Sequence, residues 1–161
     1  MDQTYGVMLL SRLPVADWKA DYLPKAGGIQ RRSYFQAVLN LNADDQITVI
    51  GTHFDHLSAQ VRVEQAKHLL EVWSDSSRTI IAGDMNARPG SPEMELFTAA
   101  GMINAQDATG NESLETYPST NPRVRIDWRF GSSDLAFSDF VIPRTLASDH
   151  LPLAVTVEIQ E

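Results

Sequence analysis

The stretch that decides the fold is residues 80–89, which read IIAGDMNARP. Two isoleucines followed by two small residues predict a strand that carries Asp84 and Asn86 to its end. Because side chains alternate along a strand, Asp84 and Asn86 are expected on one face, where they offer an anionic oxygen, a neutral oxygen and an amide donor at one spot. The alternative is an Asx-turn that only ends the strand.

Upstream, residues 51–56 read GTHFDH and follow another apolar run. His53 is the stronger catalytic candidate, whereas His56 fits equally well as a core or surface histidine without a catalytic role. Metallo-β-lactamase-like hydrolases carry a similar His-x-His-x-Asp-His motif, but Gly51 stands where their first histidine should be. That alternative therefore lacks a zinc ligand.

Downstream, Asp149 and His150 directly precede the last predicted strand. Adjacent side chains in a strand point to opposite faces, so each needs a partner elsewhere. Asp127, within the run Arg125–Trp128, is the expected partner of His150. Such a carboxylate fixes the tautomer of the imidazole and raises its pKa, which suits a group that holds a proton near neutral pH.

These acids, amides and imidazoles are the candidate catalytic and metal-binding groups of the chain. No Ser or Cys stands beside a base, and no glycine-rich phosphate loop is present. Oxygen ligands favour a hard cation, Mg²⁺ or Mn²⁺, over zinc, and two imidazoles beside it suit a phosphate substrate.

The rest of the chain alternates strand and helix patterns, which predicts one mixed α and β domain. Helices are expected over residues 58–75, with Ser58 as N-cap, and from Ser91 to a stop at Gly101. Polar loops are expected over residues 11–32 and 104–122. The predicted strands are residues 5–10 (buried), 33–41, 46–54, 78–82, 125–130, 135–140 and 153–159.

Composition narrows the possible functions. The 161 residues are 43% apolar, which fits one domain, and 13 basic against 21 acidic residues give a net charge of −8. An acidic surface repels nucleic acid unless cations or a local basic patch intervene, and the arginines at positions 31, 32, 123 and 125 are candidates for such a rim. The absence of Cys excludes disulfides and thiolate sites. Neither a signal peptide nor a membrane-spanning run is predicted, and the compartment stays open.

Four motifs together resemble the endonuclease/exonuclease/phosphatase superfamily in their order and spacing. They are Thr52–His56, Gly83–Asn86, Arg125–Trp128 and Ser148–His150. Residues 5–12 look like a strand of that family, and Arg62 with Gln65 resembles its Arg-x-x-Gln helix. The resemblance implies an α+β, DNase I-like four-layer α/β/β/α sandwich and metal-dependent hydrolysis of a phosphate ester.

Roles for individual residues follow from this resemblance alone. Asp84 is implied to orient or deprotonate the attacking water, and His150, paired with Asp127, to contact the scissile phosphate. His53 is implied to stabilise the developing charge or protonate the leaving oxygen. The implied ligands of Mg²⁺ or Mn²⁺ are Asp149, Asp84 and Asn86, with Asn86 also able to hold a phosphate oxygen.

Two departures from the family pattern bear on activity. Members have an Asn on their first strand and a metal-binding Glu on their first helix, and residues 1–50 contain no Glu. We therefore expect residues 1–161 to form a single domain that lacks the N-terminal strands and first helix. Arg129 stands where the family has an apolar residue, and we expect it to face away from Trp128, towards solvent.

Two hypotheses remain open. In the first, the chain hydrolyses a nucleic acid, a phospholipid headgroup or a small phosphoester. In the second, it is a catalytically impaired fragment or binding module whose exposed sheet is completed by a partner or by homodimerisation.

Overall fold

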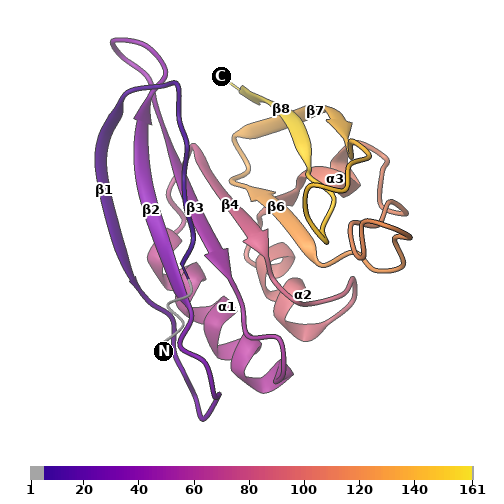
Figure 1. Cartoon of the computed structure of the whole chain (residues 1–161). Coiled ribbons are helices and arrows are strands. Elements are labelled where there is room, and N and C mark those ends of the chain that lie inside the picture. Colours follow the sequence, from indigo (N-terminus) through magenta and orange to yellow (C-terminus); the bar gives the residue numbers. More distant parts are fainter. Residues whose placement is uncertain (1–5, 161) are drawn as a thin grey trace.

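A six-stranded sheet organises the chain in the computed structural model, which describes residues 6–160 (Figure 1). Its strand order is β1-β2-β3-β4-β6-β5, and all neighbours are antiparallel except β3 and β4. The strands are β1 (Val15–Tyr22), β2 (Ser33–Asn40), β3 (Gln46–His53), β4 (Thr79–Asp84), β5 (Ile103–Asn104) and β6 (Asp127–Gly131).

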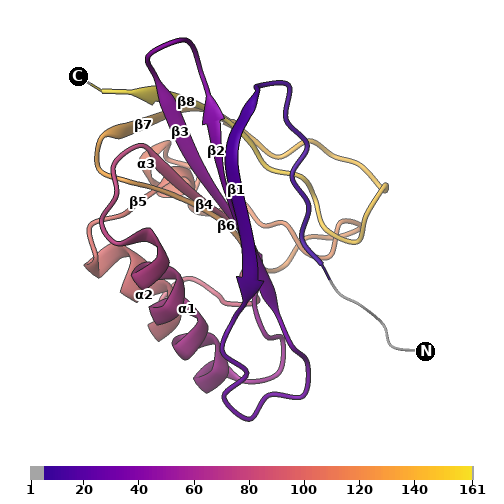
Figure 2. The ribbon, with the colours of Figure 1, turned by 90° about the vertical axis from the view of Figure 1, so that its left-hand side faces the viewer.

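Helix α1 (Ala59–Trp73) makes the crossover between the parallel strands β3 and β4, and α2 (Pro92–Ala99) lies beside it (Figure 2). The hydroxyl of Ser58 accepts the Val61 N–H at 3.3 Å, so the predicted N-cap of α1 is confirmed. Short helix α3 (Ala105–Ala108) packs against β6. None of the described helices is long and apolar enough to cross a membrane.

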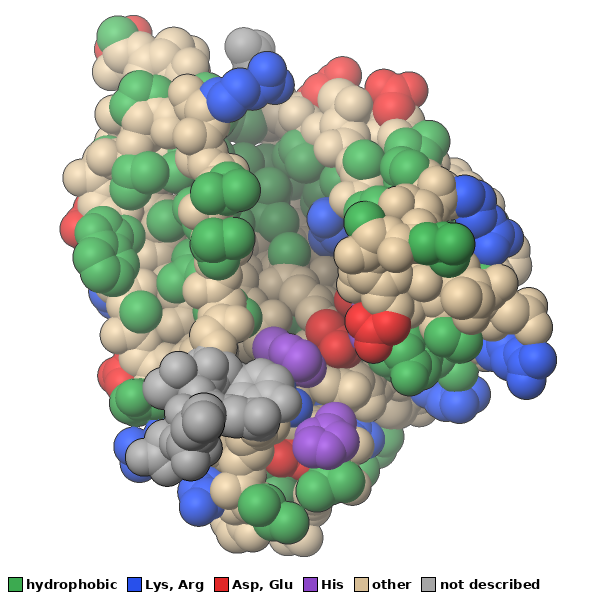
Figure 3. Space-filling model, viewed as in Figure 1, with side chains coloured by type: hydrophobic (Ala, Val, Ile, Leu, Met, Phe, Trp, Pro, Cys, Tyr) green, Lys and Arg blue, Asp and Glu red, His purple; other side chains and the backbone are tan. Residues whose placement is uncertain are grey.

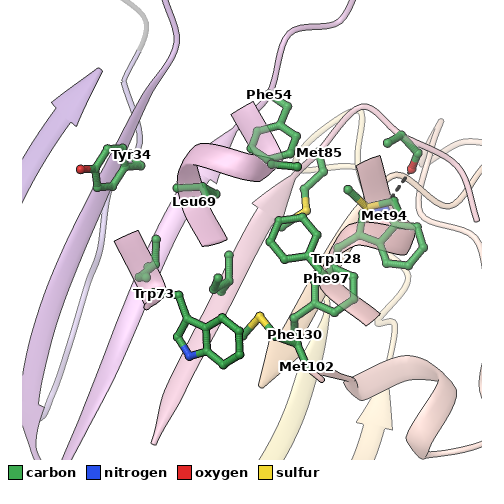
Figure 4. Close-up of a cluster of buried hydrophobic side chains, with 14 of the residues drawn as sticks. Tyr34, Phe54, Leu69, Trp73, Met85, Met94, Phe97, Met102, Trp128 and Phe130 are labelled. Carbon is green, nitrogen blue, oxygen red and sulfur yellow. Dashed lines mark hydrogen bonds between the residues drawn. The ribbon is translucent and has the colours of Figure 1, made fainter. Parts of the chain in front are cut away.

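The main core lies between the large sheet and helices α1 and α2 (Figure 4). Phe97 from α2 stacks on Phe130 from β6 with ring centroids 4.8 Å apart, and Trp128 stacks on the same ring at 5.5 Å. Phe54, Phe97 and Phe130 are fully buried. Burial stabilises each such side chain by about 1.5–3 kcal/mol, so this layer fixes the strands whose ends carry the polar motifs.

A two-stranded sheet of β7 (Leu135–Val141) and β8 (Ala154–Ile159) covers part of the opposite face. Leu135 and its neighbours on these strands pack against Ala37, Leu39 and Ile47 of the large sheet. Period-two alternation thus sends one set of side chains to the helices and the other to the small sheet. The chain therefore forms helix, sheet and sheet layers in one α and β fold.

Three sequence expectations about elements are wrong. Strand β1 falls within residues 11–32, which were expected to be a loop, and all eight of its residues are exposed. Residues 6–10 are not a buried strand, since Met8 and Leu10 are 78% and 84% exposed; residue 5 lies outside the described residues. The expected loop 104–122 contains α3, the end of β5, and a bridge from Tyr117 to Val124.

Candidate active site

The polar motifs meet where three neighbouring strands of the large sheet begin or end. We call this row of strand ends the catalytic edge, although none of the three is an outer strand of the sheet. His53 at the end of β3 lies opposite Asp84 at the end of β4, and Asp84 lies opposite Asp127 at the start of β6. His150 reaches the same edge from the loop before β8. The sheet topology thus brings together three residues that are widely separated in sequence, and the loop before β8 adds the fourth.

A close approach between β3 and β4 sets this edge. Gly83 has a φ of 154°, and a Cβ at this position would overlap the carbonyl oxygen of Thr52. Only glycine fits there without moving a strand. The Gly-Asp sequence therefore has a structural cause: the glycine lets β4 approach β3 directly before Asp84.

The side chains form a continuous polar chain. Nδ1 of His150 lies 2.8 Å from Oδ2 of Asp127, which is the pair expected from the sequence. Nε2 of His150 lies 3.8 Å from Oδ2 of Asp84, and Nε2 of His53 lies 3.3 Å from the same oxygen. The Asp84 carboxylate is therefore flanked by two imidazoles.

The pKa values of the two histidines shift in opposite directions. Burial lowers the pKa of His53 to about 4, assisted by the positive charge of Arg32. Burial also opposes the charged form of His150, but the hydrogen bond to Asp127 and the nearby carboxylates outweigh it and raise its pKa above the ordinary value. His53 is therefore neutral near neutral pH and makes no ion pair with Asp84, whereas the shift of His150 favours its protonated form more than in a free histidine.

Burial raises the pKa of Asp84, and a hydrogen bond from the Asn86 backbone partly offsets the effect. That bond, from the Asn86 N–H to Oδ1 of Asp84 at 2.9 Å, is the Asx-turn considered as the alternative to a functional role. The two roles coexist, since Oδ1 closes the turn while Oδ2 faces the histidines. A more basic carboxylate is better suited to accept a proton.

Asn86 is held by the backbone around it. Its φ is 49°, in the left-handed region, and its Nδ2 donates to the carbonyl of Phe54 at 3.1 Å. Asparagine tolerates this conformation better than most residues. The amide therefore ties the end of β4 to the loop that follows His53.

One group of side chains has the spacing of a metal site. Ligand atoms of Asp84, Asp127 and His150 all lie within 4.8 Å of one another, and the three residues are partly buried. Two carboxylates suit a hard divalent cation. Asp149 does not join this group among the described residues; its side chain is exposed and accepts from the Ser148 hydroxyl at 3.3 Å.

The model of the endonuclease/exonuclease/phosphatase family matches residues 2–150. The chain belongs to this family. The metallo-β-lactamase-like alternative, already short of a ligand at Gly51, is overturned by this assignment. No curated protein matches the chain in sequence.

Solved structures of the family share the fold at low sequence identity. A conserved protein of unknown function from Enterococcus faecalis has a TM-score of 0.79 and 18% identity over 92% of this chain and 68% of its own. A family protein from Bacteroides thetaiotaomicron has a TM-score of 0.79 and 16% identity over 90% and 65%. D. rerio TDP2 complexed with a single-stranded DNA product has a TM-score of 0.63 and 16% identity over 87% and 67%. The chain thus has the DNase I-like fold and spans about two thirds of these structures.

The Arg-x-x-Gln motif of the family holds the loop after His53. Oε1 of Gln65 accepts the Asp55 N–H at 2.8 Å, and Nη1 of Arg62 donates to the Asp55 carbonyl at 3.3 Å. Arg62 is itself fixed by Glu93 of α2, with Nε 2.6 Å from Oε1. Glu93 is fully buried, and its role was not predicted, because an acid in the first turn of a helix is usually exposed.

Two residues of segment 104–122 also position the site and were not predicted. The Thr116 hydroxyl donates to Oδ2 of Asp127 at 2.5 Å. The Ser119 hydroxyl donates to the Ser148 carbonyl at 2.6 Å, next to His150. Hydroxyl residues in a polar segment give no sequence signal of such contacts, because the partners are distant in the chain.

The site opens into a cavity of about 620 Å³ between the large sheet, residues 7–9 and the loop that precedes β8. Figure 3 shows this hollow, with apolar side chains along it and acidic and histidine side chains gathered at one end. Arg129 lines the cavity, so its expected place in solvent is wrong, although it does lie on the opposite face from Trp128.

The arginines expected to form a rim are dispersed. Arg125 is buried over the Trp128 ring at 4.2 Å, and Arg31 lies over the Tyr22 ring at 4.5 Å. Arg32 is buried with Nη2 3.2 Å from Nδ1 of His56. Arg31 and Arg125 therefore lie against aromatic rings, whereas the charge of Arg32 acts on His53 and Asp84.

Proposed function

We propose that the chain hydrolyses a phosphate ester by in-line attack of water, with Mg²⁺ or Mn²⁺ bound at the sheet edge. The observation that carries this proposal is the Asp84 carboxylate flanked by His53 and by the His150–Asp127 pair at the mouth of a cavity. Family membership supports the same reaction class.

Asp84 is the proposed general base. Its pKa is raised by burial, and Oδ2 is directed towards both imidazoles, so an attacking water is oriented and deprotonated there. His53, being neutral and with Nε2 3.3 Å from Oδ2, is the proposed orienting neighbour of this carboxylate. This replaces the role implied by the resemblance, in which His53 stabilised charge or protonated the leaving oxygen.

His150 is the proposed phosphate contact. As an imidazolium it donates Nδ1–H to Asp127 and keeps Nε2–H for a phosphate oxygen or the leaving oxygen. Thr116 donates to the same oxygen of Asp127 and so holds that carboxylate in place. Proton donation to the leaving oxygen and charge stabilisation thus come from one positioned group.

The carboxylates of Asp84 and Asp127 fit a hard cation. Asn86 and Asp149 are further proposed ligands from the family resemblance alone, with Asp149 outside this cluster. When bound, the cation neutralises charge that develops on the phosphate. The substrate class proposed from the fold is a nucleic acid, a phospholipid headgroup or a small phosphoester. D. rerio TDP2, a structural neighbour, is complexed with a DNA product.

The test is release of 4-nitrophenolate from bis(4-nitrophenyl) phosphate with Mg²⁺ or Mn²⁺. We expect EDTA to abolish turnover, and Asp84→Asn and His150→Gln each to lower kcat by roughly 10²- to 10⁴-fold. His68→Gln is the matched control, because His68 lies on α1 beside Tyr34. Turnover that survives EDTA and both site variants would refute the proposal.

A second candidate function is a module completed by another polypeptide, of which a homodimer is the simplest form. The outer edge of β8 pairs with no strand among residues 6–160. Met8, Leu10 and Trp18 are also 67–84% exposed. Free edges and exposed apolar side chains are usually covered. Sedimentation velocity over a range of concentrations tests this candidate, and a monomer throughout excludes the homodimer.

A further inference from the structure

Arg129 occupies a distinctive place beside the candidate active site. It lies on β6 two residues after Asp127, so both side chains point to the same face of the sheet. Both line the same cavity, in which Arg129 is the only Lys or Arg among the described lining residues. A strand rises about 3.3 Å per residue, which separates the Cα atoms of Asp127 and Arg129 by about 7 Å.

The guanidinium is only partly engaged by the protein. Nη2 donates to the Leu153 carbonyl at 2.7 Å. Within residues 6–160, no carboxylate lies at salt-bridge distance from Arg129. Nε and Nη1 make no hydrogen bond within the described residues, and neither atom is fully buried.

Burial disfavours the charge of Arg129, and the Asp127 carboxylate supports it from beyond salt-bridge distance, so an external anion can still pair with the guanidinium directly. Phe35, Val49 and Leu153 are among the apolar residues that line the cavity with Arg129. A cation that is partly removed from water beside apolar groups is costly unless it is paired. The fork of a guanidinium also matches a phosphate or carboxylate in a bidentate arrangement.

We propose that Arg129 binds a second anionic group of the substrate, in the same cavity as the phosphate that is cleaved. The ligand class is a phosphodiester that carries a second phosphate or carboxylate, with an uncharged portion between the two that lies against the apolar walls. This inference rests on the proposed function, since it places the scissile phosphate at Asp84 and His150.

A matched pair of substrates tests the proposal: thymidine 3′-(4-nitrophenyl phosphate) with and without a 5′-phosphate. The wild-type chain is expected to favour the 5′-phosphorylated ester in kcat/KM. Arg129→Met, which keeps an unbranched apolar stem, is expected to reduce that preference by roughly 10- to 100-fold. Arg129→Lys is expected to restore part of it, because the charge remains but the fork is lost.

Lys67→Met is the matched control for loss of one positive charge, because Lys67 lies exposed on α1 and pairs with Glu64. It is expected to keep the wild-type preference. An unchanged preference in Arg129→Met would overturn the proposal, including the case in which both substrates lose activity equally.

A binding measurement separates this proposal from the proposed hydrolysis. Thymidine 3′,5′-bisphosphate, followed by isothermal titration calorimetry, needs no turnover. We expect its Kd to rise roughly 10- to 100-fold in Arg129→Met and to stay unchanged in Lys67→Met. If neither ester is hydrolysed, the proposed function fails but the Kd values still decide the role of Arg129. Equal Kd values for wild type and Arg129→Met would refute it.

Discussion

Removing Arg62 should destabilise the fold more than removing any exposed cation. Nε of Arg62 lies 2.6 Å from Oε1 of Glu93, whose side chain is 0% exposed, against 13% for Arg62. The other oxygen, Oε2 of Glu93, is already buried without a hydrogen-bond partner. In Arg62→Met, the carboxylate would therefore stay buried with neither oxygen paired to a cation.

The magnitude follows from this geometry. Breaking a buried ion pair by deleting one partner costs about 3–5 kcal/mol, because an uncompensated charge remains. For a chain of this size, such a loss lowers Tm by roughly 6–20 °C. Replacing both partners, in Arg62→Met/Glu93→Leu, removes the stranded charge, so we expect most of this stability to return. The Asp55 carbonyl still loses its donor, so the loop after His53 stays less ordered and kcat/KM stays low.

Urea unfolding followed by tryptophan fluorescence gives the free energies of unfolding for this comparison. Lys67→Met breaks the exposed pair with Glu64, whose side chains are 52% and 46% exposed, and should change stability by less than about 0.5 kcal/mol. A loss below about 1 kcal/mol in Arg62→Met, similar to this control, would contradict the reasoning. A double variant less stable than Arg62→Met would contradict it as well.

Three further changes test the site and the core. Asp127→Asn removes the hydrogen bond and charge that keep the pKa of His150 high, so the alkaline limb of the pH profile of kcat/KM should move to lower pH; an unmoved limb counts against His150 as the proton carrier. In the wild-type chain, protonated His150 stabilises the fold at low pH, and this stability is lost as pH rises through its raised pKa. The pH-dependent part of the free energy of unfolding, measured by urea titration, should therefore shrink in Asp127→Asn. Thr116→Val deletes the donor to Asp127 and should cost about 1–2 kcal/mol by urea unfolding. Phe130→Ala removes a fully buried ring that stacks on two others and should lower the free energy of unfolding by about 3–5 kcal/mol in the same assay. A loss of less than about 1 kcal/mol would mean that neighbouring side chains move in to fill the cavity.

Strong local periodicity made most elements predictable. Helix α1 and strands β2 and β3 appear at the predicted residues within two or three positions, because each has one buried face. Strand β1 was missed because it is exposed along its whole length. Its alternation of Ala and aromatic residues with Asp and Lys over residues 16–22 was the available signal. Residues 6–10 are apolar but lack a strand partner among the described residues, which sequence cannot reveal.

Site residues were predictable from the sequence where they lie at the end or start of an apolar strand. His53, Asp84 and Asp127 were found because apolar runs deliver them to a common edge, and His150 because it needs a partner. Their pKa shifts were not predictable, since the positive charge of Arg32 and the degree of burial depend on the assembled fold. The same holds for Thr116 and Glu93, whose partners lie 11 and 31 residues away in sequence.

The indole of Trp128 links the core to the catalytic edge in a way that can be observed optically. Its Nε1 donates to the Ala87 carbonyl at 2.8 Å, just beyond Asn86, while its ring contacts both Phe130 and the Arg125 guanidinium. Trp18, by contrast, is 67% exposed on β1. A soluble quencher such as acrylamide should therefore silence Trp18 first. The residual emission would then come from the buried indoles, of which Trp128 is the one bonded to the backbone beside the proposed ligands.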